Sequence, residues 1–458
     1  MDGPPTDPVV NGGAPTFGLA TAVFVVISSM IGTGVLTTSG FTVAHVGSNE
    51  LMLVLWVVGG VLAACGALAL CELAAAIPHS GGDYVYVRAA YGPMAGFLAG
   101  WVSFLIGFGG PIAASSAAAA KYLCAGLRLT PAAWQETAIA TGIVIALGLV
   151  HGLGRHSTIR TQSIMTLVTL GFLVVLAAAG LLSGRGDWSS IADRPAITPS
   201  ICLAMASSLV YVSYAYSGWN AAAYIAGEVD VPHRLVPQAI LIGTGLVTAV
   251  YLGLNVMYAI ALSAADIQSI VAQRGLNAVA PIAQLAAERL FGPWTAVPLA
   301  LATAVTLVAS ASAYVLTGPR IAAAMARAGQ FPAIAGIMST GGAPAIATAM
   351  QVAWALVLLW TASFEVILLY AGVGLAIFSM LTVAAVFVLR VRQPELARPF
   401  KTLGYPFVPA VYLLGTGTLT LAVGIERPLV AAVSLATILG GIPVYCLWRW
   451  LTEPVVRG

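Results

Sequence analysis

The chain has 458 residues, of which 60% are hydrophobic and only 8% are charged, and its mean hydropathy is +0.96. Soluble domains carry roughly 25% charged residues, and a soluble core cannot hide so much apolar surface. The composition therefore excludes a soluble protein and predicts an integral membrane protein in contact with the lipid bilayer. The net charge of +3 gives no sign of a nucleic-acid partner, and we expect none.

Twelve segments are predicted to cross the membrane, because a helical span needs roughly 20 apolar residues. Polar tails, residues 1–16 and 450–458, flank them. Residues 78–93 are rich in turn formers and are expected to be a tight connection, whereas 263–294 opens with a helix-capping pattern that predicts short helices outside the membrane. The predicted spans are 17–43, 51–77, 94–124, 132–152, 159–182, 201–226, 236–262, 295–325, 343–361, 364–390, 406–425 and 428–449.

The distribution of Lys and Arg predicts the orientation of these spans. With the N-terminus inside, twelve of the 19 Lys and Arg residues fall in cytoplasmic segments and seven fall outside. The densest cluster, residues 390–401, is then cytoplasmic. Both termini are therefore predicted to be cytoplasmic in a multi-pass protein of the cell membrane, which in a bacterium is the inner membrane.

Small residues interrupt two of the predicted spans. The first span contains Ile31-Gly32-Thr33-Gly34, and the sixth contains Ser217-Gly218-Trp219-Asn220. Inside a membrane, a broken helix exposes N–H and C=O groups that cost several kcal/mol each unless they are paired. Either interruption alone also fits close helix packing through small residues. A corresponding pair, near the start of each five-span half, is typical of inverted-repeat transporters that bind their ligand at the breaks.

No pattern in the sequence carries enzyme chemistry. We find no phosphate-binding loop, no metal-ligand cluster and no credible catalytic triad, so neither an enzyme nor a cofactor is predicted. Carboxylates are nearly absent from the spans, and Glu72 and Glu228, at span ends, are expected to be anchors or ion-pair partners. A cationic cargo would lack a counter-charge, which favours a neutral or zwitterionic cargo.

Together with the two interruptions, further motifs give the chain a resemblance to the amino acid–polyamine–organocation superfamily, and within it to the L-type amino acid transporters. The resemblance runs over residues 17–450 with the order of the motifs preserved. Five stretches carry it: Ile31–Val35 in the first span, Cys71–Tyr86 at the exit of the second, Tyr214–Pro237 around the end of the sixth, Arg320–Pro332 at the end of the eighth, and Leu389–Pro406 after the tenth.

The resemblance implies an all-α integral membrane fold of twelve transmembrane helices. Residues 17–182 (spans one to five) and 201–390 (spans six to ten) would form a five-plus-five inverted repeat with discontinuous helices 1 and 6. Residues 406–449 would add two C-terminal helices.

For the site, the resemblance implies a clamp for a free α-amino acid. The substrate carboxylate would meet N–H groups at the first interruption, and the ammonium would meet carbonyl oxygens at the second. Tyr214 falls where the family places an aromatic gate, and Asn220 where L-type members carry a polar residue near the site. The candidate substrate-binding residues are Ile31, Gly32, Thr33, Gly34, Tyr214, Tyr216, Ser217, Gly218 and Asn220.

One position departs from the family. Many relatives carry a lysine in the fifth span, where sodium-coupled members of the fold bind an ion, but this span has no lysine and aligns Thr169 there. Thr169 and Ser310 of the eighth span are therefore a candidate ion site, with Na⁺ or H⁺ as the candidate coupling ion. The alternative is that both hydroxyls bond to their own helices.

The predicted function is a secondary transporter of neutral amino acids that works by alternating access and, as the L-type resemblance implies, by exchange. Two alternatives stay open: a sodium- or proton-coupled symporter, and a non-transporting amino acid receptor on the same scaffold. L-type animal members hold a heavy subunit through an outer-loop cysteine. Here the loop after the third span is short, with Cys124 near its start, so no heavy subunit is expected.

Overall fold

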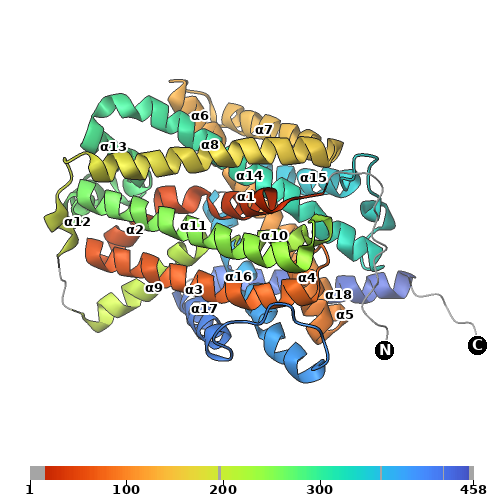
Figure 1. Cartoon of the computed structure of the whole chain (residues 1–458). Helices are drawn as coiled ribbons and strands as arrows, with labels where there is room; N and C mark the ends of the chain where they lie inside the picture. The colour runs from red at the N-terminus through yellow and green to blue at the C-terminus, as the bar shows by residue number, and fades with distance from the viewer. Residues whose placement is uncertain (1–15, 194–196, 362–363, 427, 453–458) are drawn as a thin grey trace, which may run out of the picture.

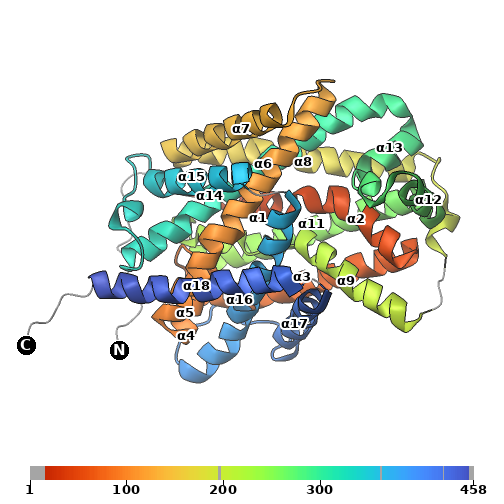
Figure 2. The ribbon, with the colours of Figure 1, turned by 180° about the vertical axis from the view of Figure 1, so that it is seen from behind.

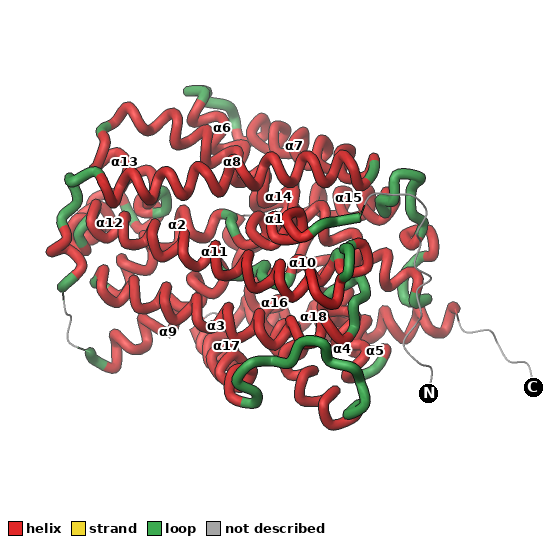
Figure 3. Tube along the Cα trace, viewed as in Figure 1, coloured by secondary structure: helices red, strands yellow, loops and turns green. Residues whose placement is uncertain are grey.

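The structure, a computed structural model, describes residues 16–193, 197–361, 364–426 and 428–452. Within these ranges the chain is helical, apart from loops and one isolated β-bridge (Figure 3). Ten helical segments are long and apolar enough to span a membrane, and two more apolar helices are shorter. Together they coincide with the twelve predicted spans, the shorter two at the sixth and ninth. The all-helical membrane fold is confirmed, whereas the number of twelve crossings stays a prediction.

The first five spans contain two departures from a continuous α-helix. The first span is broken between two helices, as predicted, and the third contains a π-helix, Ser103–Phe108, that the sequence did not reveal. The helices of this half are α1 (Leu19–Met30), α2 (Thr33–Val46), α3 (Asn49–Ala76), α5 (Pro93–Val102), α6 (Gly109–Gly126), α7 (Ala133–Leu153) and α8 (Arg155–Leu182).

The sixth span is also broken, and its second part is short. The predicted span reached residue 226, but α9 (Pro199–Ala215) ends at the interruption and only α10 (Ala221–Tyr224) and a 3₁₀ turn, Ala226–Glu228, follow. The remaining long helices are α11 (Pro232–Ala261), α14 (Ala296–Arg327), α15 (Ala345–Thr361), α16 (Phe364–Arg392), α17 (Phe407–Glu426) and α18 (Pro428–Thr452).

Among the described residues, the connections hold three further α-helices. Residues 78–93 are not merely a tight turn, because α4 (Asp83–Tyr91) forms there after two glycines with positive φ. The short helices predicted in 263–294 are present as α12 (Ala264–Arg274) and α13 (Ile282–Phe291). Figure 1 shows α12 and α13 at one end of the bundle, and α4, α10 and the end of α18 at the other.

The helices of the two halves pack against each other in matching pairs. In the order of the spans, α2 contacts α9, α3 contacts α11, α6 contacts α14, and α7 contacts α15. Two other contacts also correspond. The fifth span (α8) packs on the eighth (α14), and its counterpart, the tenth span (α16), packs on the third (α6). Such pairing is expected when a two-fold axis relates five spans to the next five. Seen from behind, α18 crosses α16 and α5 and packs against both (Figure 2).

The two carboxylates at span ends are ion-paired, as expected. Glu228 is bonded to both Arg155 and Arg320, at 2.9 and 2.7 Å, and all three side chains are largely buried. Glu72 pairs with Arg390 at 2.7 Å. Because a buried charge is costly unless it is paired, these contacts hold α8, α14 and α16 in place at the end of the bundle that carries α10.

Candidate functional site at the two helix breaks

The first break leaves the start of α2 without a cap. Met30 ends α1 and Ile31 is extended. Gly32 is the N-cap residue of α2, and as a glycine it has no side chain that could cap the helix. The first four N–H groups of any helix lack intrahelical partners, and they lie at the positive end of the helix dipole. An uncapped start inside a membrane protein is therefore suited to bind an anion.

The second break is a tight turn between α9 and α10. Ser217 closes it, because its N–H and its hydroxyl both donate to the carbonyl oxygen of Tyr214, at 3.0 and 2.7 Å. Gly218 follows with φ of +98°, a conformation that residues with a Cβ atom adopt only at a cost. The N–H of Ala221 then donates to the Gly218 carbonyl and starts α10.

The two breaks touch each other. A Cβ atom added to Gly218 would collide with the backbone carbonyl of Ser29, and one added to Gly34 would lie 2.6 Å from the Cα of Ala215. The hydroxyl of Tyr251, on α11, contacts the carbonyl oxygens at the end of both broken helices, α1 and α9. The breaks are therefore parts of one structural unit rather than two separate irregularities.

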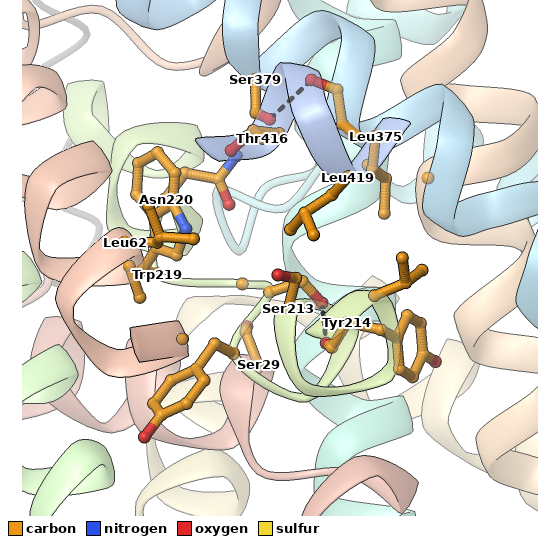
Figure 4. A pocket seen from close by; sticks show the side chains of 18 of the residues that line it. Ser29, Leu62, Ser213, Tyr214, Trp219, Asn220, Leu375, Ser379, Thr416 and Leu419 are labelled. Atoms are coloured by element: carbon orange, nitrogen blue, oxygen red, sulfur yellow. Dashed lines mark hydrogen bonds between the residues drawn. The ribbon is translucent and has the colours of Figure 1, made fainter. Parts of the chain in front are cut away.

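A cavity of about 160 Å³ lies beside this unit, roughly ten times the 10–15 Å³ that one water molecule occupies on the same measure. Among the described residues, its lining carries hydroxyl, aromatic, aliphatic and amide groups but no Asp, Glu, Lys, Arg or His side chain (Figure 4). Since an unpaired charge is costly away from water, the cavity suits a molecule without net charge. Its lining includes Ser29, Gly59, Leu62, Phe108, Tyr211, Ser213, Tyr214, Tyr216, Ser217, Gly218, Trp219, Asn220, Tyr224, Tyr314, Leu375, Ser379, Tyr412, Thr416 and Leu419.

The structure places the candidate residues of the two breaks differently. All five from the second break line the cavity: Tyr214, Tyr216, Ser217, Gly218 and Asn220. Ile31, Gly32, Thr33 and Gly34 do not, and the first break reaches the lining only at Ser29. Tyr214 precedes Ala215, the residue of α9 that packs against Gly34 at the start of α2. Tyr214 therefore lines the cavity next to the contact between α9 and α2.

Sequence reasoning missed several residues of the lining. Phe108 ends the π-helix of the third span, for which the sequence has no recognised signal. Tyr314 lines the cavity from α14, and its hydroxyl donates to the carbonyl oxygen of Ser29 at 2.9 Å. A tyrosine in an alanine-rich span needs a partner for its hydroxyl, and that was the signal that could have found it.

The candidate ion-site residues are buried with unsatisfied hydroxyls. Thr169 and Ser310 are each 1% exposed, and neither hydroxyl has a hydrogen-bond partner among the described residues. The alternative that both bond to their own helices is therefore wrong for this structure. Ser310 lies at the first break, since a Cβ atom on Gly32 would be 3.1 Å from its Oγ. Thr169 is on α8, which packs on both α1 and α14.

Comparisons with known proteins agree over nearly the whole chain. Residues 17–442 match the family described as amino acid permease. Large neutral amino acids transporter small subunit 2 of Rattus norvegicus is 30% identical over 446 residues, which are 95% of this chain and 81% of that protein. Asc-type amino acid transporter 1 of Mus musculus is 29% identical over 94% of this chain and 81% of its own length. The serine/threonine exchanger SteT of Bacillus subtilis is 28% identical over 95% of this chain and 97% of its own.

Proposed function

The chain belongs to the amino acid permease family, and on that premise we propose that it is a transporter rather than an enzyme, exchanging neutral amino acids across the membrane by alternating access. The observation that carries the proposal is the contact between the two helix breaks, beside a cavity whose described lining holds no ionisable acidic or basic side chain. One break offers N–H groups to an anion and the other offers carbonyl oxygens to a cation. A zwitterion fits this pair without needing a charged partner.

Within this proposal, the substrate carboxylate binds the uncapped N–H groups of Gly32, Thr33 and Gly34. The ammonium binds at the second break, near Tyr216 and Ser217. Tyr214 is the gate, because it lines the cavity next to the contact between α9 and the start of α2. When this side chain moves, a molecule in the cavity gains access to the start of α2.

Exchange is the favoured mode, since one relative, SteT of Bacillus subtilis, is named a serine/threonine exchanger. Counterflow tests it in proteoliposomes that hold the purified protein. Uptake of a labelled neutral amino acid that requires unlabelled amino acid inside supports exchange. Uptake driven by a sodium or pH gradient alone, with empty vesicles, would instead establish a symporter. Saturable binding without any uptake would favour a receptor.

Substitution of Gly32 tests the carboxylate site. Gly32→Leu places a bulky side chain where an added Cβ is already 3.1 Å from Ser310 Oγ, so we expect amino acid binding to be lost while the protein still folds. Gly171→Leu is the matched control, because an added Cβ at that exposed position on α8 meets nothing within 4 Å. Normal binding by Gly32→Leu would show that the carboxylate binds elsewhere.

Ion-coupled symport is a second candidate function, supported by the unsatisfied hydroxyls of Thr169 and Ser310. Buried hydroxyls without partners are uncommon, and together with backbone carbonyls of the first span they are suitable ligands for Na⁺.

We further propose that both termini are cytoplasmic, from the distribution of Lys and Arg, and that the protein works without a heavy subunit.

A further inference from the structure

A buried carboxylate lies directly behind the cavity wall. Asp83, the first residue of α4, is 2% exposed and does not line the cavity. Its Oδ2 accepts a hydrogen bond from the hydroxyl of Tyr224 at 2.9 Å and another from Nδ2 of Asn220 at 3.2 Å. Asn220 and Tyr224 both line the cavity. Asp83 is therefore one side chain away from any bound molecule.

The glycines before Asp83 make this contact possible. Gly82 has φ of +53°, and a Cβ atom there would overlap the ring of Tyr224. The ring of Phe108 packs edge-on against the same tyrosine, with ring centroids 5.1 Å apart. These contacts hold the tyrosine ring in place, with its hydroxyl directed at Asp83.

The carboxylate also determines which way the Asn220 amide faces. An ionised carboxylate only accepts hydrogen bonds, whereas an asparagine amide donates through nitrogen and accepts through oxygen. Nδ2 of Asn220 lies 3.2 Å from both Asp83 Oδ2 and the Tyr224 hydroxyl, so both amide hydrogens are used. Turning the amide over would place Oδ1 against Asp83 and lose these bonds. Oδ1 is thus the atom of the Asn220 amide that is left to accept a hydrogen bond from a molecule in the cavity (Figure 4).

We propose that Asp83 is a positioning residue, which fixes the Asn220 amide so that Oδ1 accepts a hydrogen bond from the substrate ammonium. The inference rests on the proposed function and deepens it, because it adds one side-chain acceptor for the ammonium to the carbonyl oxygens of the second break. The groups bonded to Asp83 among the described residues are neutral. Its negative charge is therefore not cancelled locally, and it strengthens the amide oxygen as an acceptor for a cation.

A purely structural role for Asp83 makes different predictions. An acidic side chain in the first turn of α4 also interacts favourably with the positive end of the helix dipole. Loss of Asp83 therefore lowers the stability of the protein whether its role is structural or positioning. Only the positioning role links Asp83 to the discrimination between molecules with and without an ammonium group.

The test compares pairs of molecules that differ only in that group. L-leucine is paired with 4-methylpentanoate and L-threonine with 3-hydroxybutanoate, and the Kd of each is measured by thermal shift on purified full-length protein. In Asp83→Asn, residue 83 can itself donate, so the Asn220 amide is free to turn over. We expect the amino acid to bind about tenfold more weakly, as for a lost hydrogen bond to a charged group, and its deamino analogue to bind as before.

Two variants complete the experiment. Tyr224→Phe keeps the bond from Asn220 to Asp83 and should keep most of the preference for the amino acid. Asn220→Ala should lose the preference, and adding Asp83→Asn to it should cause no further loss. If Asp83→Asn keeps the wild-type preference for the amino acid over its deamino analogue, the inference is overturned and the transporter proposal stays intact. If Asp83→Asn does not fold, an unchanged preference in Asn220→Ala overturns it in the same way. If the wild-type protein binds none of the twenty amino acids, both proposals are overturned.

Discussion

The hydroxyl of Tyr251 donates to the carbonyl oxygen of Met30 at 2.7 Å, and thereby closes the end of α1 at the point where the first span breaks. The same hydroxyl lies 3.1 Å from the carbonyl oxygen of Ala215, where the sixth span breaks. One side chain from the seventh span thus serves the C-terminal ends of both broken helices. Because these carbonyls have no intrahelical donor, the tyrosine stabilises the two breaks together.

Tyr251→Phe is expected to destabilise the protein, because it removes this donor and leaves buried carbonyl oxygens without it. The cost of an unsatisfied buried group is about 1–3 kcal/mol, and thermal unfolding in detergent should occur at a lower temperature. Tyr258→Phe is the matched control: Tyr258 is buried on the same helix, and its hydroxyl has no partner among the described residues. Equal melting temperatures for the two variants would mean that the Tyr251 bonds contribute nothing measurable.

Gly218→Ala is expected to weaken amino acid binding at least tenfold. The residue has φ of +98°, and its new Cβ would collide with the Ser29 carbonyl, so the second break must move away from the first. Strain of this kind costs on the order of 1–3 kcal/mol, and 1.4 kcal/mol is a factor of about ten in affinity. Gly245→Ala, at an open position on α11, should bind as the wild type does. Unchanged binding by Gly218→Ala would show that the geometry of this turn does not affect recognition of the amino acid.

The sequence predicted the positions of these breaks because small residues in an apolar span are visible in one dimension. The candidate residues that the family resemblance suggested at the second break, among them Tyr214, Ser217 and Asn220, do line the cavity. That they bind the substrate stays a prediction. The chain alone did not reveal that Ser29, rather than Gly32, lines the cavity. That depends on how α1 is rotated against α14, which is a property of packing.

Asp83 illustrates a second limit. Its motif was visible in the sequence, but a run of turn formers around it favoured a simple connection over the helix α4. Its function follows only from contacts with Asn220 and Tyr224, which lie 137 and 141 positions away along the chain. No periodicity or spacing encodes a contact of that separation.

Amino acid affinity is expected to fall as the pH is lowered from neutral. Burial raises the pKa of Asp83, although the hydrogen bonds from Tyr224 and Asn220 act in the opposite direction. In the part of the chain that the structure describes, the titratable side chains that interact with Asp83 are tyrosines, namely Tyr224, Tyr86 and Tyr412. A raised pKa means that the carboxyl takes up its proton above the usual pH range of an aspartate. Protonated Asp83 can donate, so it no longer fixes the Asn220 amide.

The measurement is the Kd of L-leucine or L-threonine across this pH range, in the wild type and in Asp83→Asn. Neither molecule changes its own charge between neutral and mildly acidic pH, so a change in Kd reports on the protein. Asp83→Asn should bind weakly at every pH, with a flat profile. A wild-type slope that persists in the variant would assign the pH dependence to another group.

The ion-site prediction concerns Thr169, whose buried hydroxyl has no partner among the described residues. If Na⁺ binds between Thr169, Ser310 and carbonyls of the first span, removing one oxygen ligand should weaken sodium binding. Thr169→Val should therefore need about tenfold more sodium for half-maximal uptake, which corresponds to 1.4 kcal/mol. Thr169→Lys should remove sodium dependence altogether, because the ammonium takes the place of the ion. Thr244→Val is the control, since it also removes a buried, unpartnered hydroxyl, but from α11. Sodium dependence that is the same in the wild type and all three variants would exclude Thr169 from the ion site.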